Sequence, residues 1–419
     1  MVEFQKLFKD ILLKTLLLFT LLLSTSLFAS FHGVILDKNT SLPIANAAIS
    51  DSLYTTKSDA NGSFFIDSKE KIYHIKAYGY RPFSFQEDNN STVIKLEPIK
   101  VKALYLTFWG ASNNSGTLKK ILNLIDKTQA NAVVVDVKNE YGSTSFWTKF
   151  EQANSYGAHK NRTNRNIKKF MQTMKEHNIY TIARIVTFKD ELQASNNLEY
   201  AIKKEEDGSV WRNHDKMAWV DPFDKRSHEY TISIAEEAAK VGYDEINFDY
   251  IRFPAKAGLC FEDENTQKNR IKAIGDFLDQ AQKRLKKYGV FISVDTYGNV
   301  CWAKDDNGIG QTVSSLAKHA DYLCPMLYPS GFSSGSFYFK YPAEHPYDVV
   351  FRSIKTIRDR VDSSRVRPWL QYFKDYTNKR KPYKRKEIQA QIQATEDAGA
   401  NGWMLWSPSS RYHLNYLIK

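Results

Sequence analysis

The sequence predicts an α/β protein, a (β/α)8 TIM barrel preceded by a small all-β sandwich domain. Past Val101, short apolar runs alternate with amphipathic stretches, which indicates repeated βα units around a parallel sheet. Eight of these apolar runs can be counted, the number of strands in a TIM barrel. Before Val101, short alternating runs are separated by Asn, Asp, Gly and Pro, which is typical of a small antiparallel sandwich.

The first 29 residues have the pattern of a Sec-type signal peptide. Lys6, Lys9 and Lys14 precede the apolar run "TLLLFTLLLSTSLFA", which is short for a membrane span and ends at a small residue, Ala29. An uncleaved N-terminal anchor is the alternative. No cysteine follows Ala29 closely, which argues against a lipoprotein. We therefore expect a periplasmic or secreted protein, associated with the envelope surface at most.

Residues 31–97 form the predicted sandwich. The segments "LPIANAAI", "SDANGSFFI" and "KAYGYRP", with Gly33 and Asp37 in the first strand, resemble the carboxypeptidase regulatory-like (transthyretin-like) domain. Gly62 suits a tight turn and Ala47 a core strand. The resemblance implies a spacing or attachment role.

Residues 102–419 form the predicted barrel. Its strands are predicted in "KALYLTFW", "NAVVVDVKN", "YTIARIVTF", "DEINFDYIRF", "VFISVDTYG", "YLCPMLYP", "VRPWLQYF" and "GWMLWSP". Intervening helices are predicted in "GTLKKILNLIDKTQ", "RSHEYTISIAEEAAKVG" and "KEIQAQIQATEDAGA", among others. A doubly wound open sheet is the alternative, but no glycine-rich phosphate loop follows the first strand.

Polar side chains collect on the predicted inner face of the barrel. Side chains alternate between the two faces of a strand, and the helix layer should cover the apolar face. The inward set is then Asp136, Lys138, Arg184, Asn247, Asp249 and Asp295. The pair Asp136 and Lys138 reads best as an internal salt-bridge set.

Two aspartates of this set end neighbouring strands. Parallel strands lie about 4.8 Å apart, so the carboxyls of Asp249 and Asp295 could be roughly 5–6 Å apart, near the separation found in retaining glycosidases. Arg252 could pair with either carboxylate and hold it ionised. Glu140 is a weaker candidate for the second carboxylate.

Aromatic residues also gather where the predicted strands end, at the catalytic rim of such barrels. Trp109, Tyr328 and Trp406 lie at or near the ends of the first, sixth and eighth strands, and Tyr141, Tyr297 and Trp302 lie in rim loops. Aromatic faces give sugar rings an apolar platform.

The run "MAWVDPFDKRSHEYTISIAEEAAKVGYDEINFDYIRFP", followed by "SVDTYG", "YLCPMLYPSGF" and "GANGWMLWSPSS", resembles a bacterial glycoside hydrolase family of barrel proteins, distantly similar to α-amylase-type barrels. In this resemblance Asp221 matches the aspartate closing the loop before the fourth strand. Asp249 would be the nucleophile and Asp295 the acid/base. The sequence departs from the amylase pattern, which has glutamate at the end of the fifth strand and an aspartate after the seventh, where Asp375 lies only in the following loop.

We therefore hypothesise hydrolysis of an envelope or extracellular polysaccharide by a two-carboxylate retaining mechanism. Asp249 and Asp295 are the catalytic candidates, and the substrate-binding candidates are Arg252, Asp136, Arg184, Asn247, Trp109, Tyr328 and Trp406. A non-catalytic carbohydrate-binding envelope protein is the alternative.

Other ligands and cross-links are judged from the remaining residues. The +12 formal charge is scattered among acidic residues and favours an anionic envelope surface or polymer rather than nucleic acid. We expect no cofactor and no metal, because His159, His177, His214 and His319 lack ligand spacing; metal-assisted deacetylation is thereby disfavoured. An oxidising compartment would permit a disulfide between Cys260 and Cys301, whose loops should be neighbours, and Cys324 is expected to be buried and free.

Overall fold

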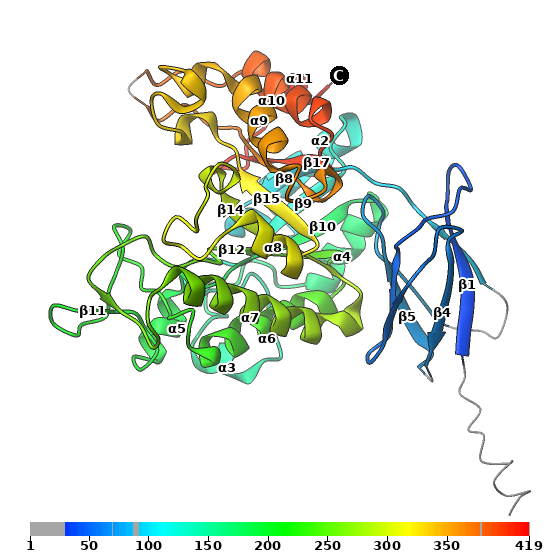
Figure 1. Ribbon diagram of the computed structural model, residues 1–419, viewed down its shortest axis with the longest axis horizontal. Coiled ribbons are helices and arrows are strands. Elements are labelled where there is room, and N and C mark those ends of the chain that lie inside the picture. Colours follow the sequence, from blue (N-terminus) through cyan, green and yellow to red (C-terminus); the bar gives the residue numbers. More distant parts are fainter. Residues whose placement is uncertain (1–29, 69, 87–91, 378, 419) are drawn as a thin grey trace, which may run out of the picture.

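The structure is a computed structural model that describes residues 30–68, 70–86, 92–377 and 379–418. The expected signal peptide, residues 1–29, lies outside the described residues. The described chain forms an N-terminal unit of two β-sheets and a closed eight-stranded barrel surrounded by helices (Figure 1). The predicted fold class is therefore confirmed.

The N-terminal unit is built from a three-stranded sheet, β4-β1-β7, and a four-stranded sheet, β3-β2-β5-β6. The strands are β1 (Ser30–Asp37), β2 (Ala48–Ser50), β3 (Thr55–Lys57), β4 (Ser63–Asp67), β5 (Ile72–Lys76), β6 (Phe83–Gln86) and β7 (Thr92–Leu96). Alternate residues of both sheets, including Ile35, Ile49 and Ile75, share one buried core. Apolar alternation thus predicts which face of each strand is buried.

Two details of this unit were predicted and one was not. Ala47 is fully buried, and Gly62 turns with a φ of 75°, where an added Cβ would lie 2.4 Å from the carbonyl oxygen of Ile35. The sandwich is not entirely antiparallel, because β1 pairs with β7 in parallel register. These are the first and last strands of the unit, so a long path connects them and leaves their relative direction free.

The barrel closes in the order β10-β12-β14-β15-β16-β17-β8-β9, with all pairs parallel. Its strands are β8 (Val101–Leu106), β9 (Ala132–Lys138), β10 (Tyr180–Val186), β12 (Glu245–Asp249), β14 (Phe291–Tyr297), β15 (Tyr322–Met326), β16 (Trp369–Gln371) and β17 (Gly402–Trp406). Each overlaps one of the eight predicted runs. Side chains such as Val134 and Ile182 pack inside the barrel, while Val133 and Val135 pack under the helices.

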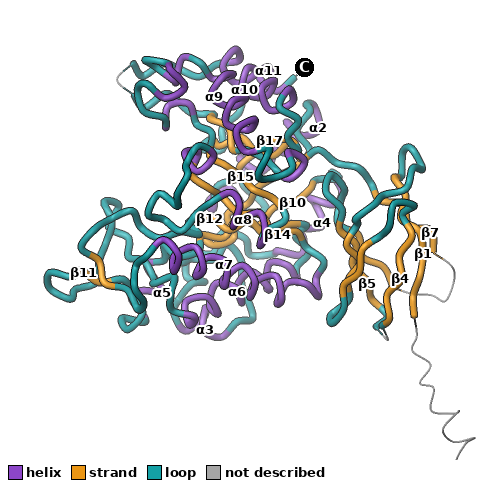
Figure 2. Tube along the Cα trace, in the orientation of Figure 1, coloured by secondary structure: helices purple, strands orange, loops and turns teal. Residues whose placement is uncertain are grey.

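Amphipathic helices cover the outer face of the barrel (Figure 2). The main ones are α2 (Gly116–Lys127), α4 (Ile167–Glu176), α6 (Lys225–Lys240), α7 (Gln267–Leu285), α8 (Val313–His319), α9 (Pro346–Ile357) and α10 (Arg385–Asp397). Helix α2 shows the pattern: the Ser115 hydroxyl caps it by accepting a hydrogen bond from the Leu118 amide, and Leu118, Ile121 and Ile125 face the strands.

Short elements decorate the connecting loops. They are the helices α3 (Glu151–Ser155), α5 (Glu191–Asn196) and α11 (Leu414–Leu417), the ribbon of β11 (Lys203–Lys204) and β13 (Leu259–Cys260), and the 3-10 turns η1 (Phe108–Ala111), η2 (Lys286–Tyr288), η3 (Gly298–Cys301), η4 (Pro329–Gly331), η5 (Ser336–Tyr338), η6 (Pro342–Glu344) and η7 (Ser363–Arg365). The described part of the chain contains no helix that is both long and apolar enough to cross a bilayer.

The disulfide that the sequence would permit between Cys260 and Cys301 is not present in the structure. All three cysteines are free. Cys260 is exposed because β13 carries it into the ribbon with β11, whereas Cys301 is buried in η3. Cys324 lies within β15 and is buried and free, as predicted.

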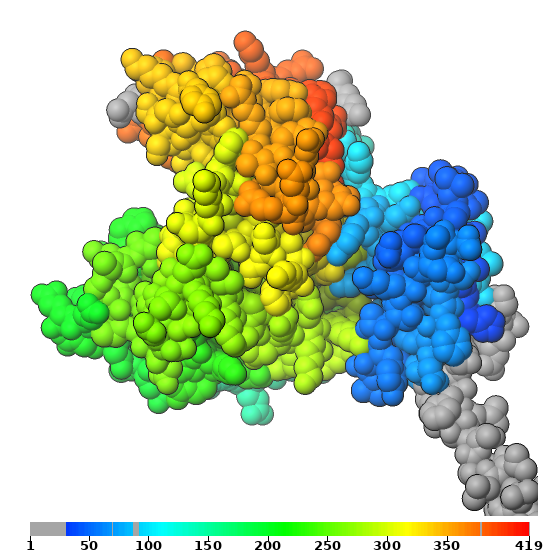
Figure 3. All heavy atoms as spheres, viewed as in Figure 1, coloured from blue at the N-terminus to red at the C-terminus, as the bar shows by residue number. Residues whose placement is uncertain are grey.

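The N-terminal unit docks on the barrel where the strands begin. The Lys76 ammonium lies 2.8 Å from a carboxylate oxygen of Asp321 and donates to the Val290 carbonyl, and the Gly79 amide donates to the Tyr322 hydroxyl. Because these barrel residues immediately precede or open β14 and β15, the contact lies at the N-terminal end of the barrel. Figure 3 shows the unit against this side of the barrel and a notch in the surface on the opposite side.

Candidate active site

Asp249 and Asp295 lie side by side at the C-terminal end of the barrel. Residues Phe248 and Val294 are paired in the register of β12 and β14, so the next residues of the two strands, Asp249 and Asp295, are neighbours. Strand β12 ends at Asp249 because Tyr250 adopts a left-handed conformation with a φ of 49°. The amide of Tyr250 donates to Asp249 Oδ1 at 2.6 Å. A bulky residue at positive φ is strained, and such strain is typical of functional sites.

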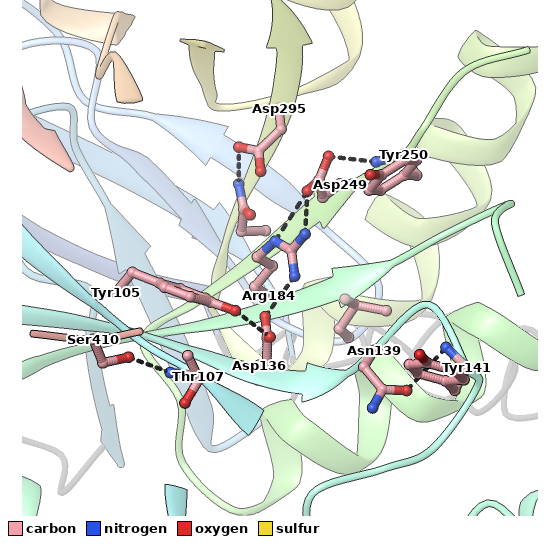
Figure 4. A network of polar contacts seen from close by, with 12 residues as sticks. Tyr105, Thr107, Asp136, Asn139, Tyr141, Arg184, Asp249, Tyr250, Asp295 and Ser410 are labelled. Atoms are coloured by element: carbon pink, nitrogen blue, oxygen red, sulfur yellow. Dashed lines mark hydrogen bonds and ion pairs between the residues drawn. The ribbon is translucent and has the colours of Figure 1, made fainter. Parts of the chain in front are cut away.

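Arg184 joins Asp249 to Asp136 (Figure 4). From β10, its Nε and Nη2 atoms donate to Asp249 Oδ2 at 3.0 and 2.5 Å, and Nη1 donates to Asp136 Oδ1 at 2.5 Å. The hydroxyl of Tyr105 donates to the other oxygen of Asp136 at 2.5 Å. Arg184 is 4% exposed, so its charge acts in a region with little water to screen it. The planar guanidinium thus supplies the counter-charge for both carboxylates.

Burial raises the pKa values of two carboxyls in the site, Asp295 and Asp136, and neighbouring charges add to or oppose that rise. Desolvation, followed by the charge of Asp249, raises the pKa of the Asp295 carboxyl well above its usual value. Asn247 Nδ2 and Trp369 Nε1 donate to Asp295 Oδ1 at 2.9 and 2.8 Å, and Oδ2 has no partner among the described residues. Burial also raises the pKa of Asp136, which the charge of Arg184 opposes. The site therefore places a carboxyl whose pKa is raised by burial, Asp295, beside a carboxylate that is hydrogen-bonded to arginine.

The two aspartates line a cavity of about 320 Å³. Six of the nine predicted site residues lie on its wall, namely Arg184, Asp249, Arg252, Asp295, Tyr328 and Trp406. Asp136 and Asn247 are buried below the wall and contact it through Arg184 and Asp295. Trp109 does not line the cavity, because η1 holds it at the surface, where it is 69% exposed. Its role in substrate binding stays a prediction.

Comparison with known proteins places this barrel in a family. Residues 103–412, most of the chain, match the family model described as "Putative glycosyl hydrolase domain". The chain belongs to this glycosyl hydrolase family. No curated protein matches it in sequence.

Several solved structures are similar to this protein. A hypothetical protein from Ruminiclostridium thermocellum is 35% identical, with 46% of this chain and 96% of that chain covered and a TM-score of 0.41. The PgaB (BpsB) glycoside hydrolase domain from Bordetella bronchiseptica is 12% identical over 75% of this chain and 95% of that chain, with a TM-score of 0.57. A chitinase from Bacteroides thetaiotaomicron is 11% identical over 76% and 95%, with a TM-score of 0.46. The PgaB domain likeness shows the barrel fold. The α-amylase relation and the carboxypeptidase-type resemblance stay predictions.

Two ion pairs predicted from the sequence do not form, and other residues take the place of the expected partners. Arg184, not Arg252, holds Asp249, because the left-handed turn at Tyr250 sends Arg252 outward to the cavity rim. Lys138 does not pair with Asp136: its ammonium lies 2.7 Å from Asp190 Oδ2. The register between β9 and β10 shifts after Asp136, and this irregularity moves Lys138 away from the Asp136 carboxylate.

The remaining carboxylate candidates have local structural partners. Asp221 accepts the amides of Phe223 and Glu262 at 2.9 and 2.6 Å, and burial raises its pKa to about 6. Asp375 accepts the amide and hydroxyl of Thr377. Glu140 does not line the cavity. Asp221 and Asp375 therefore shape rim loops.

Sequence reasoning missed most of the aromatic wall. Tyr250, Tyr297, Met326, Phe332, Trp369 and Tyr376 also line the cavity, of which Tyr297 alone was noted as a rim residue. Trp369 packs edge-on against Trp406 at 5.4 Å between ring centroids, and Tyr105 stacks on Trp406 at 4.0 Å. The tryptophan in "RPWLQYF", Trp369, was the sequence signal for this wall, because an indole inside a barrel strand needs a partner for its N–H.

A metal-holding cluster was not predicted. Within the described ranges, no three His, Cys, Asp or Glu side chains are grouped so that they could hold an ion.

Proposed function

We propose that this protein hydrolyses glycosidic bonds of an envelope or extracellular polysaccharide, with Asp249 and Asp295 as the catalytic pair. The observation that carries the proposal is the contrast between them: the Arg184 guanidinium donates hydrogen bonds to Asp249, while burial raises the pKa of the Asp295 carboxyl well above its usual value. Two neighbouring carboxyls in such different environments are the equipment of a glycosidase.

In the proposed mechanism, Asp295 donates the proton of its free oxygen, Oδ2, to the glycosidic oxygen as the bond to the anomeric carbon breaks. Asp249 attacks that carbon and forms a glycosyl ester. Ionised Asp295 then removes a proton from water, which attacks the same carbon, releases Asp249 and restores the proton on Asp295. Adjacent positions on strands about 4.8 Å apart favour this retaining course over the wider inverting arrangement.

The cavity wall suits a sugar ring. Tyr328, Trp369 and Trp406 provide aromatic surface beside the two carboxyls, and the Tyr328 hydroxyl can hydrogen-bond a sugar. A cavity of about 320 Å³ is at the small end of typical ligand pockets, so it would hold one or two sugar units of a longer chain.

A binding protein without catalysis is the second candidate, and one observation favours it. Both oxygens of Asp249 are already engaged, Oδ2 by Arg184 and Oδ1 by the Tyr250 amide. A nucleophile tied in this way must loosen one contact to attack. In a binding protein the same contacts would simply fix the wall of the cavity.

The test is release of reducing ends from a panel of bacterial envelope and exopolysaccharides by the purified protein. Hydrolysis supports the proposal, and the configuration of the first-formed product, read by NMR, distinguishes retention from inversion. Binding of a polysaccharide without any release would favour the second candidate. We further propose that residues 1–29 direct export and that the N-terminal unit, docked at the end of the barrel away from the cavity, acts as a spacer or attachment.

A further inference from the structure

A second arginine, Arg252, lies on the cavity wall in a setting unlike that of Arg184. Its guanidinium lies over the rings of Tyr297, Trp219 and Tyr250, at 4.7, 4.9 and 5.2 Å from the ring centroids. Nη2 donates to the Tyr297 hydroxyl at 3.1 Å and Nη1 to the Phe253 carbonyl at 3.1 Å. Three rings and two hydrogen bonds therefore fix the position of this cation.

The two arginines of the cavity wall differ in their partners. Arg184 pairs with the carboxylates of both Asp249 and Asp136. Arg252 has no carboxylate partner in the part of the chain that the structure describes. The cavity wall thus presents a guanidinium that no carboxylate engages, on a protein whose formal charge is +12.

We infer that Arg252 binds an acidic sugar unit of the substrate, so that the polysaccharide is anionic, with a carboxylate on the unit that contacts this side chain. The inference rests on the proposed function, since it takes the cavity as the carbohydrate site. A guanidinium presents a rigid fork of N–H donors that fits a carboxylate, and the stacked rings keep that fork in place before the ligand arrives. Half-burial of Arg252 leaves it accessible from solvent while reducing screening.

The chemistry disfavours a neutral sugar at this position. A hydroxyl would satisfy one donor of Arg252 but would leave its charge partly desolvated and unpaired in the filled cavity. A carboxylate removes that penalty and adds charge-assisted hydrogen bonds, each of which should raise the affinity roughly 10- to 100-fold.

The experiment measures binding in the Asp295→Asn background, which removes the proposed acid group and so slows turnover. The probes are immobilised alginate, hyaluronan and acidic bacterial exopolysaccharides, each beside the same polymer after reduction of its carboxyl groups to alcohols. We expect at least one acidic polymer to bind about 10-fold or more tightly than its reduced form, and added salt to weaken that binding.

Variants of Arg252 test whether this residue causes the preference for acidic polymers. Arg252→Gln should remove the preference for the acidic form, and Arg252→Lys, which keeps the charge but not the fork, should retain part of it. Arg358→Gln is the matched control, because Arg358 is 61% exposed and does not line the cavity. Equal binding of acidic and reduced polymers, a preference that survives Arg252→Gln, or no binding to any acidic polymer would overturn the inference. Acidic polymers bound but not cut by the unmodified protein would leave the inference standing and refute hydrolysis.

Discussion

Replacing Arg184 with glutamine is expected to destabilise the protein strongly at neutral pH. The change leaves Asp249 and Asp136, which are 8% and 4% exposed, without their counter-charge. Removing one partner of a buried ion pair costs about 3–5 kcal/mol, because the remaining charge stays desolvated. Two carboxylates lose their partner here, so we expect the upper part of that range.

The loss should depend on pH in a defined direction. Burial raises the pKa of Asp136 in the folded state, and the charge of Arg184 opposes that rise; without Arg184 the pKa of Asp136 should lie further above the value in the unfolded chain, about 3.9. The folded variant then binds protons more strongly than the unfolded chain, so its stability falls as pH rises. The difference from the unmodified protein should therefore shrink as the pH is lowered from 7 toward 4.

The assay is urea unfolding followed by tryptophan fluorescence at pH 5 and pH 7. Arg358→Gln is the control, since it makes the same chemical change in an ion pair whose side chains are 61% and 90% exposed, and it should move the unfolding midpoint far less. A loss below about 1 kcal/mol for Arg184→Gln at pH 7, or a loss that does not change with pH, would refute the counter-charge role of Arg184.

Three further outcomes follow from the structure. Asp295→Asn should melt at a higher temperature than the unmodified protein at pH 7 and at the same temperature near pH 4. The reason is that the raised pKa of Asp295 in the folded state makes the stability of the unmodified protein fall as pH rises above 3.8. The same difference in melting temperature at both pH values would count against this. Trp369→Phe removes a donor that lowers the pKa of Asp295, so the alkaline limb of the pH–rate profile should move to higher pH, and an unmoved limb would contradict the contact. Gly402→Ala should melt well below Gly116→Ala, because its Cβ would lie 1.9 Å from the Val101 carbonyl oxygen at a φ of 80°, whereas Gly116 has open space; similar melting temperatures would exclude this clash.

The barrel and its inward polar set could be predicted because they follow from local rules. Apolar runs of strand length separated by amphipathic helices specify repeated βα units, and strict alternation sorts side chains to one face or the other. That reasoning placed Asp249, Asp295 and Arg184 on one inner surface, where the structure has them. It needs no knowledge of loop geometry.

The errors arose where the backbone departs from regular strand geometry. The left-handed residue Tyr250 ends β12 early and redirects Arg252, so the arginine nearer in sequence is not the partner of Asp249. A register shift separates Lys138 from Asp136 in the same manner. Neither feature has a sequence signature, since a tyrosine at positive φ contradicts residue preference and is imposed by tertiary contacts.

The most direct test of the central claim compares the rate of reducing-end release by the unmodified protein with that of Asp249→Asn and Asp295→Asn, with Asp359→Asn as a control at a 90% exposed carboxylate. If Asp249 and Asp295 are the nucleophile and the acid, each of the first two variants should lose about 10²–10⁴-fold in kcat on the same substrate, while the control keeps its rate. Retention of full activity by either variant at a catalytic position would contradict the account.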